Sequence, residues 1–381
     1  MKLIYLTPGI FNSGGTERVL SIKANYLVDV AGFEVIIITT DQKKRKCFFD
    51  FDKRIKHYDL GINFCDDTSL SLLKFYQVRR KKNEIYRKRL EELIRKESPD
   101  VCISLFGKEF DFLPSLNISC KIIAELHFNK KFRENSYLSL HKGVLWRFIA
   151  KIRTRQLVKT SRKYDKVIVL TKEDLCQWNK TNNNVIQIYN PLPYQTQQTS
   201  ELTNKSFISV GRLSSPKNYE SLISAWSIVH NMYPDWQMNI WGDGELKDFL
   251  KNKIRTYNVE DSFILRGKTD RIDKEYLKNS AFVMSSRYEG FPMVLLEAAS
   301  FGLPLISYDC YSGPKDIIDD GVNGFLVPLN NEEALSDAMC KIIKSSELRK
   351  EMGMNAKVKS LDFSQDKILP QWPVFFYNLL K

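Results

Sequence analysis

The stretch Ser286-Arg-Tyr-Glu-Gly-Phe-Pro-Met-Val-Leu-Leu-Glu297 decides the fold of the second half of this chain. Gly290 and Pro292 end an extended segment. Residues 281–284 before them are predicted to form a short buried strand, and residues 295–300 after them favour a helix. We therefore expect a strand-to-helix loop at 290–292, whose backbone amides open a helix N-terminus and attract anions or polar ligand groups.

Two glutamates frame this loop. Glu289 lies on it, and Glu297 is expected about two turns into the helix, among apolar residues. A carboxylate in such surroundings needs a partner, because an unpaired buried charge is costly. Taken alone, the pattern fits an exposed helical glutamate beside a turn glutamate equally well.

The chain also begins with a strand, a loop and a helix. Residues 2–7 are predicted to form a strand, a glycine-bearing loop follows, and a helix is expected at about 16–31 with Thr16 as its N-cap. Gly14 and Gly15 do not fit the dinucleotide fingerprint Gly-x-Gly-x-x-Gly. Glycine is needed where backbone approaches a ligand closely, so this loop is a candidate binding element.

Strands and helices alternate along the rest of the chain, which predicts an α/β fold with parallel sheets and ligands at the carboxyl ends of their strands. The polar, proline-bearing stretch 191–204 is predicted to be a linker. It separates a domain at 1–190 from one at 205–363, and we expect the C-terminal segment 364–381 to pack on the first domain. The other expected strands are 32–39, 100–105, 120–127, 165–171, 207–211, 237–242, 263–267, 304–309 and 324–327, and helices are expected at 74–97, 142–166 and 219–229.

Composition excludes several classes of protein. The chain has 381 residues, which favours two domains. No apolar run reaches the length of about 18 residues that a membrane span needs, and the apolar N-terminal run is too short for a signal peptide. The seven cysteines are scattered and the four histidines show no ligand spacing, so neither a disulfide framework nor a metal site is expected.

The positive charge is concentrated in the first half. Residues 1–200 hold 36 Lys and Arg against 21 Asp and Glu, whereas residues 201–381 hold 22 against 24, which gives +15 and −2. The helices expected at 74–97 and 142–166 are rich in basic residues, and Trp146 beside Arg147 is typical of an interfacial membrane helix. An anionic partner is therefore expected for the first half, either a membrane surface, a phosphorylated lipid or nucleic acid; a solvated basic helix is the alternative.

The segment Glu289-Gly-Phe-Pro-Met-Val-Leu-Leu-Glu297 resembles the donor-site motif of family 4 retaining glycosyltransferases, and Gly211-Arg-Leu-Ser-Ser-Pro-Lys-Asn218 resembles their Gly-Arg-Leu-x-x-x-Lys-Asn motif. The resemblance runs from Gly14 to about Gly324. It implies the GT-B architecture, two Rossmann-like, doubly wound parallel-sheet domains that face a cleft.

The resemblance also implies roles for individual residues. Arg212 and Lys217 would bind the donor diphosphate, for which a guanidinium fork and a compact ammonium are suited. Glu297 would accept hydrogen bonds from the ribose hydroxyls. Glu289, with the backbone of Gly290 and Phe291, would bind the transferred sugar. The further donor-site positions are Pro292 beside this loop, Arg266 and Gly267 near the base, and Gly313 near the sugar or phosphate.

In the first domain, the resemblance places His127 against the donor sugar across the cleft, and Gly14 and Gly15 near the acceptor and the donor phosphate. The spacing of Glu125-Leu-His127-Phe-Asn129 departs from the family's usual cluster, so roles for Glu125 and Asn129 stay open. No enzyme nucleophile is evident. The expected mechanism is a front-face transfer in which the leaving phosphate takes the acceptor proton.

The resulting hypothesis is a metal-independent retaining transferase. It moves a hexose or N-acetylhexosamine, with UDP as the expected nucleotide, to a lipid-linked or polysaccharide acceptor in bacterial surface-glycan synthesis. Cytoplasmic placement at the inner face of the plasma membrane is expected. The alternatives are a non-hydrolysing UDP-sugar epimerase of the same architecture, which the two motifs disfavour, and a basic nucleic-acid-binding protein, for which no recognised module is present.

Overall fold

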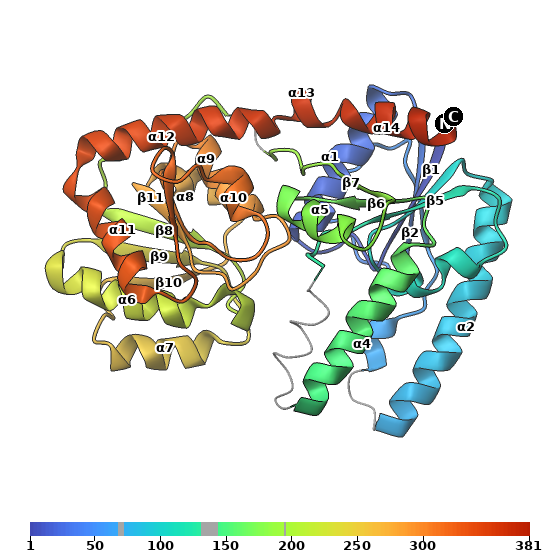
Figure 1. The fold of residues 1–381 in the computed structure, drawn as a ribbon, viewed down its shortest axis with the longest axis horizontal. Coiled ribbons are helices and arrows are strands. Elements are labelled where there is room, and N and C mark those ends of the chain that lie inside the picture. The colour runs from blue at the N-terminus through green and yellow to red at the C-terminus, as the bar shows by residue number, and fades with distance from the viewer. Residues whose placement is uncertain (68–71, 131–143, 194–195) are drawn as a thin grey trace. The chain divides into compact units, whose positions relative to one another are not determined.

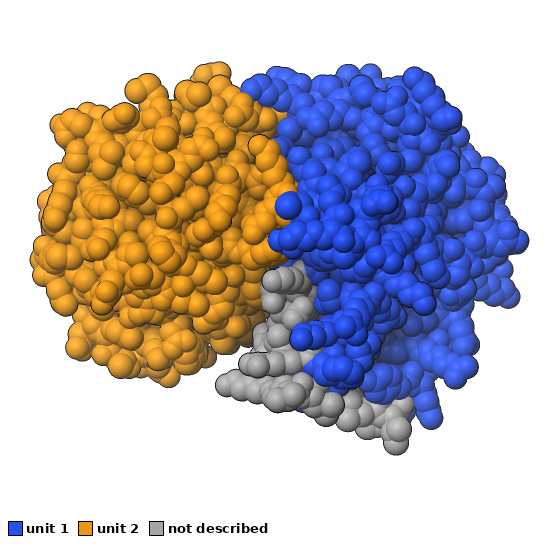
Figure 2. All heavy atoms as spheres, viewed as in Figure 1, with its two compact units in different colours: residues 1–170, 174–191, 366–381 blue, residues 171–173, 192–365 orange. Residues whose placement is uncertain are grey.

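The computed structural model describes residues 1–67, 72–130, 144–193 and 196–381. The chain forms two compact units, coloured separately in Figure 2. Unit 1 comprises residues 1–170, 174–191 and 366–381, and unit 2 comprises residues 171–173 and 192–365. The C-terminal segment 366–381 thus belongs to unit 1. The chain passes between the units on either side of residues 171–173, within the stretch proposed as a linker, and at 365–366.

Unit 1 is built on a seven-stranded sheet in the order β3-β2-β1-β4-β5-β6-β7, and every neighbouring pair is parallel. The interior strands are short apolar runs, as expected for strands buried on both faces. The strands are β1 (Lys2–Thr7), β2 (Glu34–Thr39), β3 (Lys56–Asp59), β4 (Val101–Ser104), β5 (Lys121–Glu125), β6 (Lys166–Val169) and β7 (Val185–Gln187).

Helices cover both faces of this sheet (Figure 1). Since side chains alternate between the two faces of a strand, Leu3 and Tyr5 pack in one core with α1 (Gly15–Asp29) and α14 (Gln371–Leu380). Ile4 and Leu6 pack in the other core. That second core includes residues of α2 (Leu72–Glu97), α4 (Val144–Ser161) and α5 (Lys172–Asn179).

Unit 2 has a six-stranded, wholly parallel sheet in the order β10-β9-β8-β11-β12-β13. Residues on one face of this sheet form a large core with α6 (Tyr219–Met232), α7 (Lys247–Thr256) and α11 (Glu332–Lys344). The strands are β8 (Ser206–Val210), β9 (Gln237–Trp241), β10 (Phe263–Gly267), β11 (Ala281–Met284), β12 (Leu305–Tyr308) and β13 (Gly324–Val327). The other helices are α8 (Ile272–Leu277), α9 (Met293–Ser300), α10 (Pro314–Ile317), α12 (Ser346–Ser360) and α13 (Gln365–Ile368).

The α/β fold with two parallel sheets confirms the predicted fold class, but two local predictions are wrong and one strand was missed. Gly14, not Thr16, is the N-cap of α1, and no side chain caps it. Helix α9 begins at Met293, so Glu297 lies little more than one turn into it instead of two. Strand β3 was not predicted, because its exposed residues Lys-His-Tyr-Asp lack an apolar run. The start of the basic stretch 142–166 and part of the predicted linker lie outside the described residues.

Candidate functional site

The candidate site in unit 2 lies where the strand order reverses. Strand β8 pairs with β9 on one side and β11 on the other, so the loops that follow β8 and β11 leave the carboxyl edge of the sheet next to each other. Ligands of open parallel sheets bind outside such a switch point. The two loops contain Lys217 and Glu289.

Lys217 and Glu289 form an ion pair, with Nζ 2.8 Å from Oε1 and side chains only 22% and 14% exposed. The loop holds the lysine in place. Gly211 leaves room for its stem, since a Cβ there would lie 3.1 Å from Lys217 Cε. Ser285 Oγ donates to the Lys217 carbonyl over 2.8 Å. Burial by itself lowers the pKa of Lys217, but the charge of Glu289 outweighs it and the pKa is raised.

Arg212 is not part of this pair. Its side chain is 74% exposed, and its Nε lies 3.2 Å from Glu245 Oε2. The two cations that the Gly-Arg-Leu motif predicts for a diphosphate therefore have different surroundings. Lys217 is preorganised, whereas Arg212 is held by an exposed ion pair that costs little to break.

The loop at Gly290–Pro292 packs against the loop that follows β12. Ser312 Oγ donates to the Gly290 carbonyl over 3.1 Å. Gly313 has φ +106°, and a Cβ on it would lie 2.3 Å from Pro292 Cδ. The structure therefore gives Gly313 a packing role that the sequence did not indicate: it allows close approach of the two loops.

The helix that follows this loop offers fewer open amides than expected. Pro292, the N-cap of α9, has no amide hydrogen to donate, and the amide of Met293 donates to the Phe291 carbonyl over 2.9 Å. Phe291 is 6% exposed and packs on Phe363. Glu289 is also bound to the loop that follows β12, since its amide donates to the Tyr311 carbonyl over 3.3 Å.

Glu297 has the partner that its apolar surroundings require. It is 5% exposed, and the hydroxyl of Tyr276 donates to its Oε2 over 3.0 Å. Tyr276 is fully buried on α8 and stacks on Phe301 at 5.3 Å. Sequence reasoning missed Tyr276, whose only signal was an aromatic residue in a short helix.

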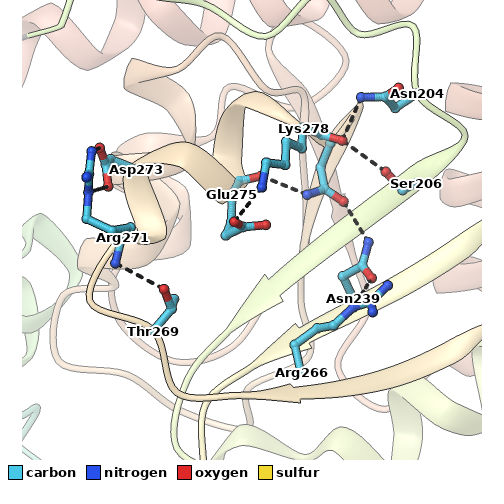
Figure 3. A network of polar contacts seen from close by, with 10 residues as sticks. Asn204, Ser206, Asn239, Arg266, Thr269, Arg271, Asp273, Glu275 and Lys278 are labelled. Atoms are coloured by element: carbon cyan, nitrogen blue, oxygen red, sulfur yellow. Dashed lines mark hydrogen bonds and ion pairs between the residues drawn. The ribbon is translucent and has the colours of Figure 1, made fainter.

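Arg266 is linked to α8 through a polar network (Figure 3). Its Nε donates to Asn239 Oδ1 over 2.8 Å, and Asn239 donates to Asn279 over 3.0 Å. Asn279 in turn donates to the Glu275 carbonyl on α8 over 2.8 Å. Gly267, with φ +82°, lies at an irregularity of the β9–β10 register, and its carbonyl accepts from the amide of Gly242. Helix α8 therefore joins the surroundings of Arg266 to those of Glu297.

In unit 1, the predicted glycines start α1. Gly14 is its N-cap and Gly15 its first residue. A Cβ on Gly14 would lie 2.3 Å from Glu17 Oε2. Asn12 Nδ2 donates to Glu17 Oε1 over 3.3 Å, so this carboxylate occupies the loop side of the helix start.

His127 follows β5 by two residues and is 8% exposed. Its Nε2 lies 3.1 Å from Oε1 of the fully buried Glu125. Lys23 of α1, 1% exposed, donates to both oxygens of the same carboxylate. Burial alone raises the pKa of Glu125, but the Lys23 charge and the His127 contact outweigh it and hold the pKa at about 2. Asn129 is also buried, and sequence reasoning missed Lys23 because most helical lysines are exposed.

The structure thus brings Lys217, Glu289, the Gly290–Pro292 loop and Gly313 together, while Glu297 and Arg266 are joined through α8. Arg212 is outside the Lys217–Glu289 pair, and Gly14, Gly15 and His127 belong to unit 1. Within the described ranges, no group of three or more His, Cys, Asp or Glu side chains could hold a metal ion.

Residues 194–359 match the sequence profile of the family described as glycosyl transferases group 1. An uncharacterized glycosyltransferase of Haemophilus influenzae is 30% identical over 384 residues, covering 97% of this chain and 98% of that protein. The amylovoran biosynthesis glycosyltransferase AmsD of Erwinia amylovora is 29% identical, with coverage of 97% and 98%. A Campylobacter jejuni α-1,4-N-acetyl-D-galactosaminyltransferase, named for an undecaprenol-diphosphate-linked GalNAc substrate, is 26% identical, with coverage of 98% and 97%.

Solved structures share the fold. TarM of S. aureus superposes with a TM-score of 0.79 at 17% identity, covering 100% of this chain and 99% of that one. Sucrose-phosphate synthase of Thermosynechococcus elongatus gives a TM-score of 0.80 at 15% identity, with coverage of 99% and 98%. At these identities the likeness concerns the arrangement of sheets and helices.

Proposed function

We propose that this chain, which belongs to the group 1 glycosyltransferases of family 4 and has their GT-B fold, moves a hexose or N-acetylhexosamine from a UDP-sugar to a lipid-linked or polysaccharide acceptor. Its membership follows from 30% identity over nearly its whole length. The family comprises retaining hexosyltransferases, so transfer of a sugar from a nucleotide sugar with retained anomeric configuration is the general activity.

The partly buried Lys217–Glu289 pair is the observation that best supports a donor site in unit 2. It lies at the switch point of a parallel sheet, where nucleotides bind, and it pairs a cation suited to a phosphate with a carboxylate suited to sugar hydroxyls. Binding of a diphosphate would draw Lys217 from Glu289 and leave the carboxylate to accept from the sugar.

The donor and the acceptor are proposed from the relatives. The C. jejuni relative is named as an N-acetylgalactosaminyltransferase that acts on an undecaprenol-linked glycan, AmsD is named for amylovoran biosynthesis, and TarM was crystallised with UDP. The UDP bound to TarM supports a UDP-sugar as the donor, and the names of the two relatives support a growing bacterial surface glycan as the acceptor.

We propose the following division of roles. Lys217 and Arg212 stabilise the negative charge of the leaving diphosphate, and Glu297, oriented by Tyr276, accepts from the ribose hydroxyls. Glu289 and the neighbouring backbone bind the transferred sugar. The leaving phosphate takes the acceptor proton on the same face of the sugar. The contact of His127 with that sugar stays a prediction.

Metal independence stays a prediction as well, and it rests on Lys217 and Arg212 as the source of positive charge. Treatment with EDTA is expected to leave the rate of transfer unchanged. Loss of activity that Mg²⁺ or Mn²⁺ restores would contradict this assignment.

We propose that unit 1 docks on an anionic membrane at the inner face of the plasma membrane, where a lipid-linked acceptor lies. In helix α4, the apolar residues Phe148 and Ile152 are 59% and 45% exposed. Lys151 and Arg155 of the same helix are also exposed. Apolar and basic residues on one helix are typical of interfacial helices. Among the described residues, no helix has the length and apolar character to cross a bilayer.

The function is tested with a panel of sugar nucleotides, bacterial membrane extract as acceptor source, and mass spectrometry of the products. We expect one UDP-sugar to be consumed with a hexose or N-acetylhexosamine added to a lipid-linked or polymeric glycan. Glu297→Gln is expected to abolish transfer, whereas Glu333→Gln, in the first turn of α11, keeps it. An isomerised sugar nucleotide formed without acceptor would favour the epimerase, and a thermal shift with single-stranded RNA but not with UDP would favour nucleic-acid binding.

A further inference from the structure

Lys23 lies in the interior of unit 1, beside an opposite charge and two aromatic rings. Its side chain is 1% exposed and comes from the middle of α1. The ammonium lies 3.9 Å from the ring centroid of Trp372 on the C-terminal helix α14 and 5.1 Å from that of Tyr5 on β1. Aromatic faces attract a cation, so two elements besides α1 contribute to holding this lysine.

The opposite charge is Glu125, the last residue of β5 and fully buried. Lys23 Nζ donates to its Oε1 over 2.5 Å and also to its Oε2. His127 Nε2 lies 3.1 Å from the same Oε1. The carboxylate therefore bridges the lysine and the histidine at the carboxyl end of the sheet, where ligands of parallel sheets bind.

We propose that Lys23 is a positioning residue for sugar transfer: it keeps Glu125 ionised, so that the carboxylate, whose Oε1 lies 3.1 Å from His127 Nε2, holds the imidazole ring in one orientation. The proposal rests on the proposed function, in which His127 contacts the transferred sugar. It extends that function to a residue of α1 that touches no substrate.

Electrostatics explains why the lysine is required. An ionised carboxylate buried without a cation is costly, so it either takes up a proton or draws one onto a neighbouring group. The groups that face Glu125 are Lys23 from α1, His127 beyond β5 and Tyr5 from β1. The phenol of Tyr5 cannot supply positive charge, and burial raises its pKa further. With Lys23 removed, His127 is the remaining described group in the cluster that can carry a balancing positive charge, so the surroundings of its ring change.

The test compares Lys23→Met, the double variant Lys23→Met with Glu125→Gln, and Lys130→Met. Lys130 is the matched control, because its ammonium also lies over a tryptophan ring of unit 1, 4.8 Å from that of Trp178, but donates to Gln177 and Thr181. Each variant is measured for kcat and donor KM across pH, for Tm, and for the imidazole nitrogen shifts of ¹⁵N-histidine-labelled protein. The chain has four histidines, and His127→Gln assigns the relevant signals.

In Lys23→Met we expect kcat to fall by about 10- to 100-fold with donor KM within about twofold, because the ring loses its orientation. The His127 nitrogen shifts should change, and so should the pH profile of activity. The double variant should restore the wild-type nitrogen shifts and much of kcat, since the carbonyl of the amide introduced by Glu125→Gln takes the place of Oε1 beside Nε2 without a charge to balance. Lys130→Met should lower Tm alone.

A fall in Tm of Lys23→Met with unchanged kcat, pH profile and nitrogen shifts would overturn the proposal and leave Lys23 a packing residue. Failure of the proposed function can be distinguished from failure of the proposal about Lys23. In that case the wild-type protein transfers no sugar from any donor, while the nitrogen shifts still report whether Lys23 controls His127. Shifts that follow Lys23 without any change in kcat would likewise overturn its part in transfer.

Discussion

At the residue scale, Lys217 and Arg212 are expected to differ in what their loss costs. Arg212→Ala and Lys217→Ala should each weaken UDP binding by about 1.5–3 kcal/mol, tenfold or more in Kd, because each removes a hydrogen bond to a charged group. Only Lys217→Ala should also lower Tm, since it takes the lysine partner from the largely buried Glu289, whereas the Arg212–Glu245 pair is exposed.

Isothermal titration with UDP and a thermal melt measure the two effects. Lys253→Ala is the control, because it removes the ion pair that Lys253 Nζ forms with Glu220 Oε1 of the same unit over 2.8 Å. This variant should change neither UDP affinity nor the catalytic rate. Unchanged UDP affinity in both loop variants would exclude this loop from the donor site.

Glu109 should make the stability of unit 1 depend on pH. It is 2% exposed and accepts from Ser104 Oγ, Tyr86 Oη and the Gly107 amide, at 2.6, 3.0 and 2.9 Å. Burial outweighs these bonds and raises the pKa of its carboxyl. The folded state therefore holds this proton more tightly than the unfolded state, and the stability due to Glu109 is complete below pH 4.5 and lost as pH rises through the raised pKa.

Melting the wild-type protein and Glu109→Gln between about pH 5 and pH 8 tests this sign. The wild type should lose stability relative to the variant as pH rises, since the amide has no charge to bury. Glu125, with its pKa lowered from 4.5 to about 2, acts in the opposite direction but only below pH 4.5, so the two groups are separable. A constant difference between the two proteins across this range would contradict the assignment.

The site residues that could be predicted from the sequence share one property: the motif that contains each of them also specifies the conformation of its loop. Glu289 and Lys217 stand beside Gly, Pro and Asn residues that specify turns, so their positions followed from local chemistry. Lys23, Tyr276 and Glu109 lie in ordinary helical or loop patterns. Their roles arise from contacts with residues distant in the chain, which no local pattern encodes.

At the scale of elements, the packing of the Gly290–Pro292 loop on the loop that follows β12 depends on a glycine. Gly313→Ala is expected to cost about 1–3 kcal/mol of stability, because a Cβ meets Pro292 and φ is +106°. It should also weaken donor binding, since the Gly290–Pro292 loop must move. Gly321→Ala is the control: φ there is +76°, but nothing lies within 4 Å of the added Cβ.

Chemical denaturation and donor KM distinguish the two glycine variants. Gly321→Ala should lose stability from backbone strain alone and keep the wild-type KM. Equal KM values in both variants would show that the packing of the two loops does not control donor binding.

Elements were predictable to the extent that they are buried. The interior strands of both sheets are apolar runs bounded by Gly, Pro or polar residues, which predicts buried parallel strands directly. The edge strand β3 is half solvated and has no such run. The N-cap of α1 deviates from expectation, because Gly14 begins this helix without a side-chain cap.

At the scale of the whole molecule, the asymmetry of charge follows the division into units closely enough to suggest separate partners. The positive excess lies within residues 1–200, most of which belong to unit 1, and the predicted donor residues 211–313 belong to unit 2. The structure also sorts the basic cluster 79–82 of α2. Arg79 donates to the Phe64 carbonyl and Lys82 to the Asn63 carbonyl, so they support a loop. Arg80 and Lys81 are exposed, and Arg80 forms an exposed ion pair with Glu84 on the same helix.

Liposome co-sedimentation tests the proposed membrane docking through Arg80 and Lys81. The protein should bind anionic but not neutral vesicles, less so as salt rises, because the attraction is screened within about 8–10 Å. Each basic residue near such a surface contributes roughly 1 kcal/mol, so Arg80→Glu with Lys81→Glu should weaken partition by at least about tenfold.

Phe148→Ser with Ile152→Ser should weaken partition onto the vesicles without changing its salt dependence. The same two charge reversals at Lys251 and Lys350, exposed residues of unit 2, should leave partition and UDP affinity unchanged. Equal binding to neutral and anionic vesicles, or to neither, would exclude the electrostatic surface and favour a freely diffusing glycan as the acceptor.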